Sequence, residues 1–443
     1  MRNFPAFFCV VNLSAVLILS LAGLADADDW PQWRGKRRDG QWNESATLKK
    51  LTPQNLKTLW RQPIGAGYSG PTVADGRVYV TGRNEKPTQQ ETINCFDAKT
   101  GKPIWDITYP SIYTVGYTAG PRASVTVEQN RAYALGAMGM LHCVKADDGE
   151  VIWKKDLDAQ YSISKSKRMP IWGIACSPII YGDTVVIVVG GDEGAALVAF
   201  NKKTGDEVWR CLDDPIQYSS PVLTSQNGND VLVCWTGAAV VGLNPATGDT
   251  YWRHPFAPTR MPIGIATPII KDGKIFLTSF YDGSMMLEMG TSDMTVKELW
   301  SARGPNERKT KALHSIISTP IWIEDHIYGV DSYGQLRCLR ASDGQRIWES
   351  QKAVAQERWG TVHFVSHDDD VWMFNEQGEV IVGQLSPEGL TEISRVKIIE
   401  PTKPQLPKRK AGVCWSHPAF ANRCIFARND NEILCVDLSE DAE

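Results

Sequence analysis

Ten aromatic, histidine and arginine residues of this 443-residue sequence share one kind of position, just before or at the start of a predicted short β-strand. They are Tyr68, Tyr117, Arg122, Trp172, Tyr218, His314, Trp359, His363, Trp415 and His417. Aromatic rings combined with Arg and His are typical of binding hot spots, and also of a pocket for a flat sugar or quinone. The same side chains could instead pack on one another and plug a channel, and the sequence leaves both interpretations open.

Arg122 is the strongest single candidate for a binding residue in this set. It lies in the segment Ala119-Gly-Pro-Arg-Ala-Ser124. A buried arginine near a channel axis needs an anionic partner, because an unpaired charge is costly to remove from water. We therefore predict that this side chain contacts an anionic group of a ligand or a partner.

The sequence contains no Gly-rich phosphate loop, no nucleophile elbow and no His pair at zinc spacing. A few acids follow predicted second strands, namely Asp192, Glu193, Asp282 and Asp331. Acids in such turns are expected to be solvated. The sequence therefore predicts no catalytic residue and no metal site, and no motif supports a hydrolase or lyase.

The composition is that of a folded protein, with 42% hydrophobic and 22% charged residues. The formal net charge is -4, so no strong positive field is present to attract nucleic acid, and we expect no nucleic-acid partner. Basic clusters at Lys165–Arg168, Arg308–Lys311 and Lys408–Lys410 are expected to be solvated loop tips.

Residues 1–27 have the pattern of a secretory signal peptide. A short basic start, Met1-Arg2-Asn3, precedes a mostly apolar stretch, and Ala25-Asp26-Ala27 fits a small-x-small cleavage site. An uncleaved N-terminal anchor is the alternative. We expect a periplasmic or secreted protein with no transmembrane segment after cleavage.

An internal repeat ending in tryptophan dominates the rest of the chain. Its clear copies are Cys95–Trp105, Cys143–Trp153, Ala199–Trp209, Gly242–Trp252 and Cys338–Trp348. With Trp60 and Trp300 included, the tryptophans recur about every 48 residues, which is the length of a propeller blade. Within a unit, short β-branched runs alternate with turns such as Asp272-Gly273, which favours antiparallel hairpins.

Eight first strands can be counted along the chain. They begin near Gly70-Pro71, Ala123, Ser177-Pro178, Ser220-Pro221, Thr267-Pro268, Thr319-Pro320, Thr361-Val362 and His417-Pro418. The eighth unit lacks a fourth strand, whereas Leu56–Arg61 is a fourth strand with no unit before it. We predict that Leu59–Arg61 pairs with Ile433–Val436, which closes the ring and removes exposed sheet edges.

The expected fold is therefore all-β, an eight-bladed β-propeller of four-stranded antiparallel blades. Residues 28–55 form an N-terminal extension and residues 56–443 form the propeller. A seven-bladed ring with unit seven or eight as an appendage is the alternative. Cys95, Cys143, Cys338 and Cys435 recur at one position of the repeat, so we interpret them as small apolar strand residues rather than a disulfide or zinc framework.

The repeated segment resembles the PQQ-like β-propeller repeat, Ala-x-Asp-x-x-Thr-Gly-x-x-x-Trp, over roughly residues 56–440. The opening Asp29-Trp-Pro-Gln-Trp-Arg-Gly35 also resembles the start of many secreted proteins with this repeat. Its tryptophans are expected to fill the gaps between blades. They are Trp105, Trp153, Trp209, Trp252, Trp300 and Trp348.

Two kinds of relative imply two functions. Quinoprotein dehydrogenases use this propeller to hold pyrroloquinoline quinone (PQQ) and calcium, with a disulfide of adjacent cysteines against the quinone, and this sequence has no Cys-Cys pair. The propeller subunit of the outer-membrane β-barrel assembly machinery is a non-catalytic scaffold.

We expect a non-catalytic extracytoplasmic binding scaffold without a cofactor, whose partner is an envelope protein or polysaccharide, and which acts as a monomer. The alternative is a PQQ-dependent dehydrogenase that oxidises an alcohol or sugar.

Overall fold

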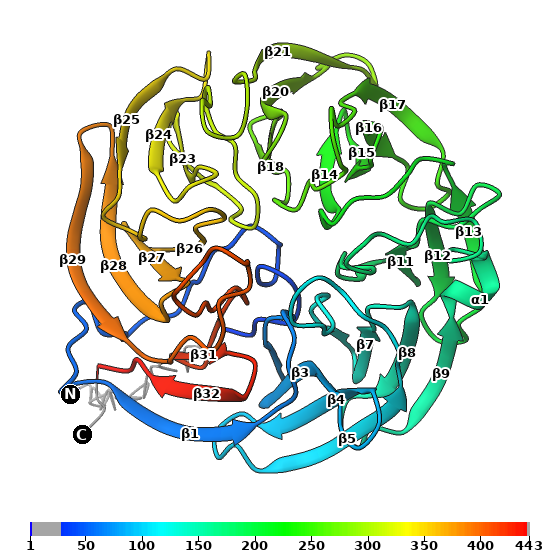
Figure 1. The fold of residues 1–443 in the computed structure, drawn as a ribbon, viewed down its shortest axis with the longest axis horizontal. Coiled ribbons are helices and arrows are strands. Elements are labelled where there is room, and N and C mark those ends of the chain that lie inside the picture. Colours follow the sequence, from blue (N-terminus) through cyan, green and yellow to red (C-terminus); the bar gives the residue numbers. More distant parts are fainter. Residues whose placement is uncertain (2–27, 441–443) are drawn as a thin grey trace.

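Each predicted repeat folds into a four-stranded antiparallel sheet, and eight such sheets surround a central axis in the computed structural model (Figure 1). The structure describes Met1 and residues 28–440. The predicted signal peptide, apart from Met1, lies outside these described residues. The predicted fold class is confirmed, and the seven-bladed alternative is wrong because units seven and eight both form complete blades.

Seven blades use four strands that are consecutive in the chain, and Figure 1 shows the fourth strands at the rim. Blades 1 to 4 comprise β2 (Thr72–Ala74), β3 (Arg77–Asn84), β4 (Gln90–Asp97) and β5 (Pro103–Pro110); β6 (Thr126–Glu128), β7 (Arg131–Leu135), β8 (Met140–Lys145) and β9 (Val151–Asp156); β10 (Ile179–Tyr181), β11 (Thr184–Val188), β12 (Leu197–Asn201) and β13 (Glu207–Cys211); and β14 (Val222–Gln226), β15 (Asn229–Trp235), β16 (Ala239–Leu243) and β17 (Thr250–Pro255).

The next three blades follow the same plan. They comprise β18 (Ile269–Lys271), β19 (Lys274–Ser279), β20 (Gly283–Met289) and β21 (Val296–Ala302); β22 (Ile321–Ile323), β23 (His326–Val330), β24 (Leu336–Arg340) and β25 (Arg346–Ser350); and β26 (Val362–His367), β27 (Asp370–Asn375), β28 (Glu379–Ser386) and β29 (Gly389–Lys397). Asp272 and Gly273 have φ angles of 49° and 72°, as the tight turn between β18 and β19 requires.

The eighth blade joins the two ends of the described chain. Its strands are β30 (Ala419–Ala421), β31 (Cys424–Arg428), β32 (Glu432–Asp437) and β1 (Lys57–Pro63). Trp60 lies opposite Cys435 and Arg61 opposite Leu434 in the antiparallel pair of β1 and β32. The predicted ring closure is therefore confirmed.

One short helix, α1 (Leu157–Tyr161), follows β9. Its five residues leave the predicted all-β fold class unchanged. Within residues 28–440, no helix combines the length and apolar character needed to span a bilayer.

In five of the repeats, the tryptophan packs on a turn glycine of the next blade. Trp60 Nε1 donates a hydrogen bond to the Ala98 carbonyl at 2.9 Å, across the junction of blades 8 and 1. Its ring lies on Gly101, where a Cβ atom would be 2.5 Å from the indole and the φ angle is 70°. Equivalent ring-on-glycine pairs are Trp105–Gly149, Trp153–Gly205, Trp209–Gly248 and Trp300–Gly344. This contact explains why a turn glycine and a tryptophan both recur in the repeat.

The recurring cysteines also occupy equivalent places. Cys95, Cys143, Cys338 and Cys435 lie in third strands, each directly opposite the tryptophan of its own blade. All four are buried and free, which confirms their interpretation as small strand residues.

Residues 28–55 cross the central axis instead of forming a blade (Figure 1). Trp30 pairs with Val73 of blade 1, and Gln41 pairs with Ser366 of blade 7. The Arg38 guanidinium donates to the backbone carbonyls of Ser177, Pro178 and Pro221 in blades 3 and 4. The extension therefore ties together the inner strands of blades on opposite sides of the ring.

The tryptophan-on-glycine contact predicts a difference between two glycines of almost equal φ. At Gly101 an added Cβ meets Trp60, whereas Gly76, with φ 71°, has nothing within 4 Å of that position. Both alanine variants carry the cost of a positive φ, about 1–2 kcal/mol, but Gly101→Ala adds overpacking of about 1–3 kcal/mol. Urea unfolding should show the larger loss for Gly101→Ala. Equal losses in the two variants would contradict the contact's role.

Candidate functional site

Nine of the ten residues singled out in the sequence line one cavity on the propeller axis. They are Tyr68, Tyr117, Arg122, Trp172, Tyr218, Trp359, His363, Trp415 and His417. Most belong to the lead-in segments, the stretches that run from the fourth strand of one blade to the first strand of the next. Because the ring is closed, these segments converge although they are spread over 350 residues of sequence, from 68 to 417.

The cavity wall is a continuous aromatic cluster with Trp359 at its centre. The Trp359 ring centroid lies 5.8 Å from that of Trp172, 5.9 Å from Trp415 and 6.5 Å from Tyr117. Trp172 in turn lies 5.2 Å from Tyr218. These separations are those of tilted and edge-to-face aromatic pairs, which stabilise the wall beyond simple burial.

A residue that the sequence analysis missed, Trp33, also lines the cavity. This residue comes from the N-terminal extension. Its Nε1 donates to Thr267 Oγ1 at 2.8 Å, and its ring meets the His417 ring edge-on at 4.3 Å. The unusual density of Trp and Arg in residues 29–42 was the available signal, but it lacks the strand pattern that placed the other residues.

Two histidines of the wall are neutral at pH 7. Burial lowers the pKa of His363 to about 4, and burial together with nearby His363 lowers the pKa of His417 to about 3. His363 Nε2 lies 3.0 Å from the Trp415 carbonyl oxygen. A Cβ at Gly70 would lie 2.1 Å from the His417 ring, so the absence of a side chain at Gly70 makes room for this histidine.

Ser124 and His417 resemble a nucleophile and its base, because Ser124 Oγ lies 2.8 Å from His417 Nε2. The geometry does not make them catalytic. Ser124 is fully buried, and a histidine with a pKa of about 3 is too weak a base near neutral pH. The pair instead links blade 8 to the lead-in segment of blade 2.

Arg122 is half-buried and has an unsatisfied donor. Its Nη1 donates to the Gly120 carbonyl at 2.8 Å, and its guanidinium carbon lies 4.9 Å from the Tyr68 ring centroid. Its Nη2 is buried and has no hydrogen-bond partner. The cavity lining contains no Asp or Glu, so the described residues that surround this cavity do not supply the anionic partner expected from the sequence.

Trp359 carries a second unsatisfied donor. Its side chain is only 6% exposed, and Nε1 has no hydrogen-bond partner. Its φ angle is 67°, in the left-handed region that non-glycine residues rarely adopt. A hydrogen bond of 2.9 Å from its backbone N–H to the Ser332 carbonyl helps hold this conformation.

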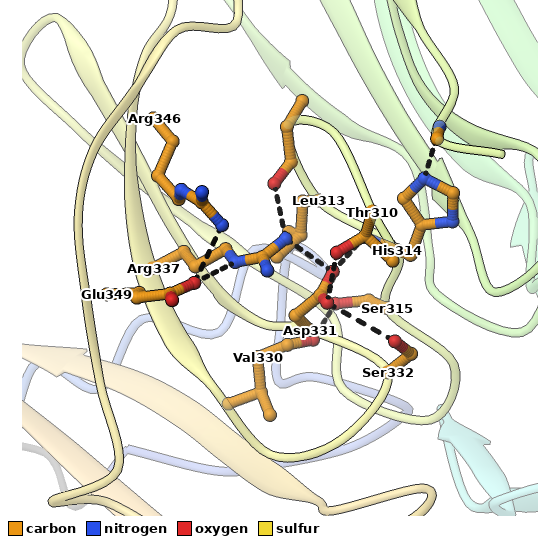
Figure 2. Close-up of polar contacts among 12 residues, drawn as sticks. Thr310, Leu313, His314, Ser315, Val330, Asp331, Ser332, Arg337, Arg346 and Glu349 are labelled. Atoms are coloured by element: carbon orange, nitrogen blue, oxygen red, sulfur yellow. Dashed lines mark hydrogen bonds and ion pairs between the residues drawn. The ribbon is translucent and has the colours of Figure 1, made fainter. Parts of the chain in front are cut away.

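His314, the tenth candidate, lies outside the cavity lining. Its Nε2 accepts a hydrogen bond from the Gly304 N–H at 3.1 Å, and Nδ1 lies 3.0 Å from the Phe280 carbonyl oxygen. Its backbone N–H donates to Asp331 at 2.6 Å, as Figure 2 shows. Its ring is fully buried, and that burial lowers its pKa. The structure thus gives His314 a packing position in the lead-in segment of blade 6.

The prediction that Asp282 and Asp331 are solvated turn residues is wrong. Asp331 is 2% exposed, accepts from Thr310 Oγ1 at 2.7 Å and pairs with Arg337 Nη1 at 2.9 Å (Figure 2). Asp282 accepts from both the N–H and the hydroxyl of Thr259. Each acid therefore anchors the lead-in segment that enters its own blade.

One expected loop-tip cation is also buried. Arg409, from the cluster Lys408–Lys410, pairs with the fully buried Glu376. Glu376 Oε2 also accepts from Trp415 Nε1 at 3.2 Å. This ion pair therefore supports the cavity wall from behind, through the hydrogen bond to Trp415.

The residues present do not fit a calcium-bound quinone. Calcium takes six to eight oxygen ligands, mainly carboxylates, carbonyls and amides. The cavity lining contains no carboxylate or side-chain amide. Across the described ranges, no group of three or more His, Cys, Asp or Glu residues is placed to hold a metal ion.

Comparison with known families gives one match across most of the chain. A family model described as outer membrane protein assembly factor BamB matches residues 44–113 and 89–350. A curated relative, the dehydrogenase subunit of a quinone-type alcohol dehydrogenase from Gluconacetobacter polyoxogenes, is 25% identical over 247 residues. That alignment covers 49% of this chain and 32% of the relative, so the chain spans about a third of that protein's length.

Two solved structures share the architecture. BamB from Moraxella catarrhalis aligns with a TM-score of 0.56 and 13% identity, covering 86% of this chain and 99% of that one. Quinohemoprotein alcohol dehydrogenase from Comamonas testosteroni aligns with a TM-score of 0.60 and 11% identity, covering 94% and 81%. At these identities the likeness shows the fold alone.

The buried neutral histidines predict a loss of stability in acid. The unfolded chain binds protons near the ordinary histidine pKa of 6.5, whereas folded His363 binds one only near pH 4. The free energy of unfolding should therefore fall as the pH drops from 6.5 to 4, by up to about 1.4 kcal/mol per pH unit for each such histidine. His363→Gln should reduce this slope by about that amount, measured by urea unfolding across the range. An unchanged slope would contradict the burial argument.

Proposed function

This chain belongs to the family described as outer membrane protein assembly factor BamB, and on that premise we propose that it is a non-catalytic extracytoplasmic binding scaffold for a protein or glycan. We further propose that it works as a monomer in the periplasm or after secretion, with an envelope protein or polysaccharide as partner. The binding site in this proposal is the aromatic cavity on the axis.

The observation that carries the proposal is the makeup of this cavity. Aromatic side chains from several lead-in segments form its wall, and two donors in that wall have no partner within the described chain. Buried donors without partners cost about 1–3 kcal/mol each. A bound partner that supplies acceptors would recover this free energy, whereas a wall that served only as packing would gain nothing from it.

The second candidate is a PQQ-dependent dehydrogenase. It is favoured by the similarity to quinone-type dehydrogenases and by the aromatic wall of the cavity. The lining lacks the oxygen ligands that calcium needs, and no carboxylate lies at the cavity to act as a base. The scaffold is therefore the better supported of the two.

Reconstitution separates the two candidates. The purified protein mixed with PQQ and calcium should show no new absorbance and no dye-linked oxidation of alcohols or glucose, because the cavity cannot complete the metal's coordination. A PQQ-dependent dye reduction that saturates with one equivalent of quinone would establish the dehydrogenase instead.

The scaffold proposal is tested by partner recovery from envelope extract. The variant Arg122→Ala/Trp172→Ala should recover its specific partner at least about tenfold less than the unmodified protein, since both side chains line the cavity. A matched control is Arg346→Ala/Ile347→Ala on the exposed outer strand β25, which should recover it normally. Equal recovery by both variants would remove the cavity from partner binding.

A further inference from the structure

We propose that the axial cavity binds a flat, single-ring anion, an aromatic carboxylate, which Arg122 and Trp359 recognise through their unpaired donors. This inference rests on the proposed binding function and names the chemical class that the same site takes. It does not involve a metal ion or a covalent step.

The wall of the cavity contains hydrogen-bond donors that have no acceptor. Arg122 Nη2 and Trp359 Nε1 both lack partners, and both residues line the cavity. Trp359 is more than nine-tenths buried, so bulk water does not solvate its indole N–H freely. A carboxylate oxygen accepts hydrogen bonds from donors of this kind, whereas an ammonium or an alkyl group cannot.

The charge balance selects an anion over a neutral acceptor. His363 and His417 are neutral because burial lowers the pKa of each well below 7. Of the described residues that line the cavity, Arg122 alone carries a charge at pH 7, and no acid faces it there. A guanidinium beside aromatic rings attracts a carboxylate strongly, because water competes weakly for both partners.

The size and wall of the cavity select one ring. Its volume is about 110 Å³, less than the about 150 Å³ of an apolar cavity that holds one benzene molecule, so it has room for one ring at most. The rings of Trp172, Trp359 and Trp415 enclose it at centroid separations near 6 Å. A flat ligand can stack or meet these rings edge-on, but a fused three-ring ligand does not fit without rearrangement of the wall.

The backbone of Trp359 supports a binding role for this residue. Its positive φ costs about 1–3 kcal/mol, and strain of this kind concentrates at functional sites. The conformation sets the indole among the rings of three other lead-in segments.

The carboxylate could belong to a free small molecule or to the C-terminal aromatic residue of a polypeptide. These two sources share the chemistry that the cavity recognises. Benzoate represents the first source, and the tripeptide Gly-Gly-Phe with a free carboxylate represents the second. Benzamide and Gly-Gly-Phe-amide are the matched controls, since each replaces only the anionic oxygen of its acid by an amide nitrogen.

The experiment is calorimetric titration of the full chain with these four compounds, with tryptophan fluorescence as a second readout. Benzoate should bind at least about tenfold more tightly than benzamide, which is the worth of one charge-assisted hydrogen bond. Of the two acids, whichever binds more tightly identifies the source, and either result supports the shared chemistry. Failure of both acids to bind, or equal affinity for acid and amide, would overturn the inference.

Variants assign the recognition to the two donors. Arg122→Gln should weaken benzoate binding about tenfold or more and abolish the preference over benzamide, and Trp359→Phe should weaken it severalfold while keeping a ring in place. Arg260→Gln is the control, because Arg260 is exposed, stacks over Tyr281 and does not line the cavity. Unchanged benzoate affinity in both cavity variants would also overturn the inference. Because partner recovery is a separate measurement, the scaffold proposal could survive that result.

Discussion

The contact between the tryptophan of one blade and the turn glycine of the next joins five of the eight pairs of neighbouring blades, including the pair that closes the ring. Trp60 makes this contact with Gly101 although its strand, β1, is distant in sequence from the rest of blade 8. The ring therefore closes through the same contact that joins four other pairs of neighbouring blades. Because the lead-in segments converge only when the ring is closed, the aromatic cavity depends on this closure.

Buried carboxylates hold the lead-in segments in place around the axis. Asp282, Asp331 and Asp430 each accept a hydrogen bond from a threonine of the lead-in segment that enters the same blade, namely Thr259, Thr310 and Thr402. Desolvating a carboxylate is costly, and several donors per acid offset that cost. These acids lie outside the cavity lining, which contains hydrogen-bond donors and aromatic rings but no carboxylate.

The sequence predicted the fold, the closing strand and nine cavity residues because these follow from a regular repeat. A repeat fixes which residues share a position, and a closed ring brings equal positions together. The prediction of cavity residues failed where the position of a residue in the repeat does not decide which way its side chain is buried. His314 lies in a lead-in segment like the others, but its side chain does not reach the cavity. Its ring accepts a hydrogen bond from the Gly304 N–H and its backbone N–H donates to Asp331, so the ring is buried between blades. Trp33 was missed because the extension has no strand periodicity, and its place depends on contacts with the assembled ring.

Native-state hydrogen exchange of the intact protein tests most directly whether the ring opens as one closed unit. The account predicts that backbone amides of β1 and of β31 exchange with free energies of opening within about 1 kcal/mol of each other, since neither strand can leave without breaking the junction of blades 8 and 1. Exchange of β1 at a free energy several kcal/mol lower, with β31 and the strands around the cavity still protected, would contradict it.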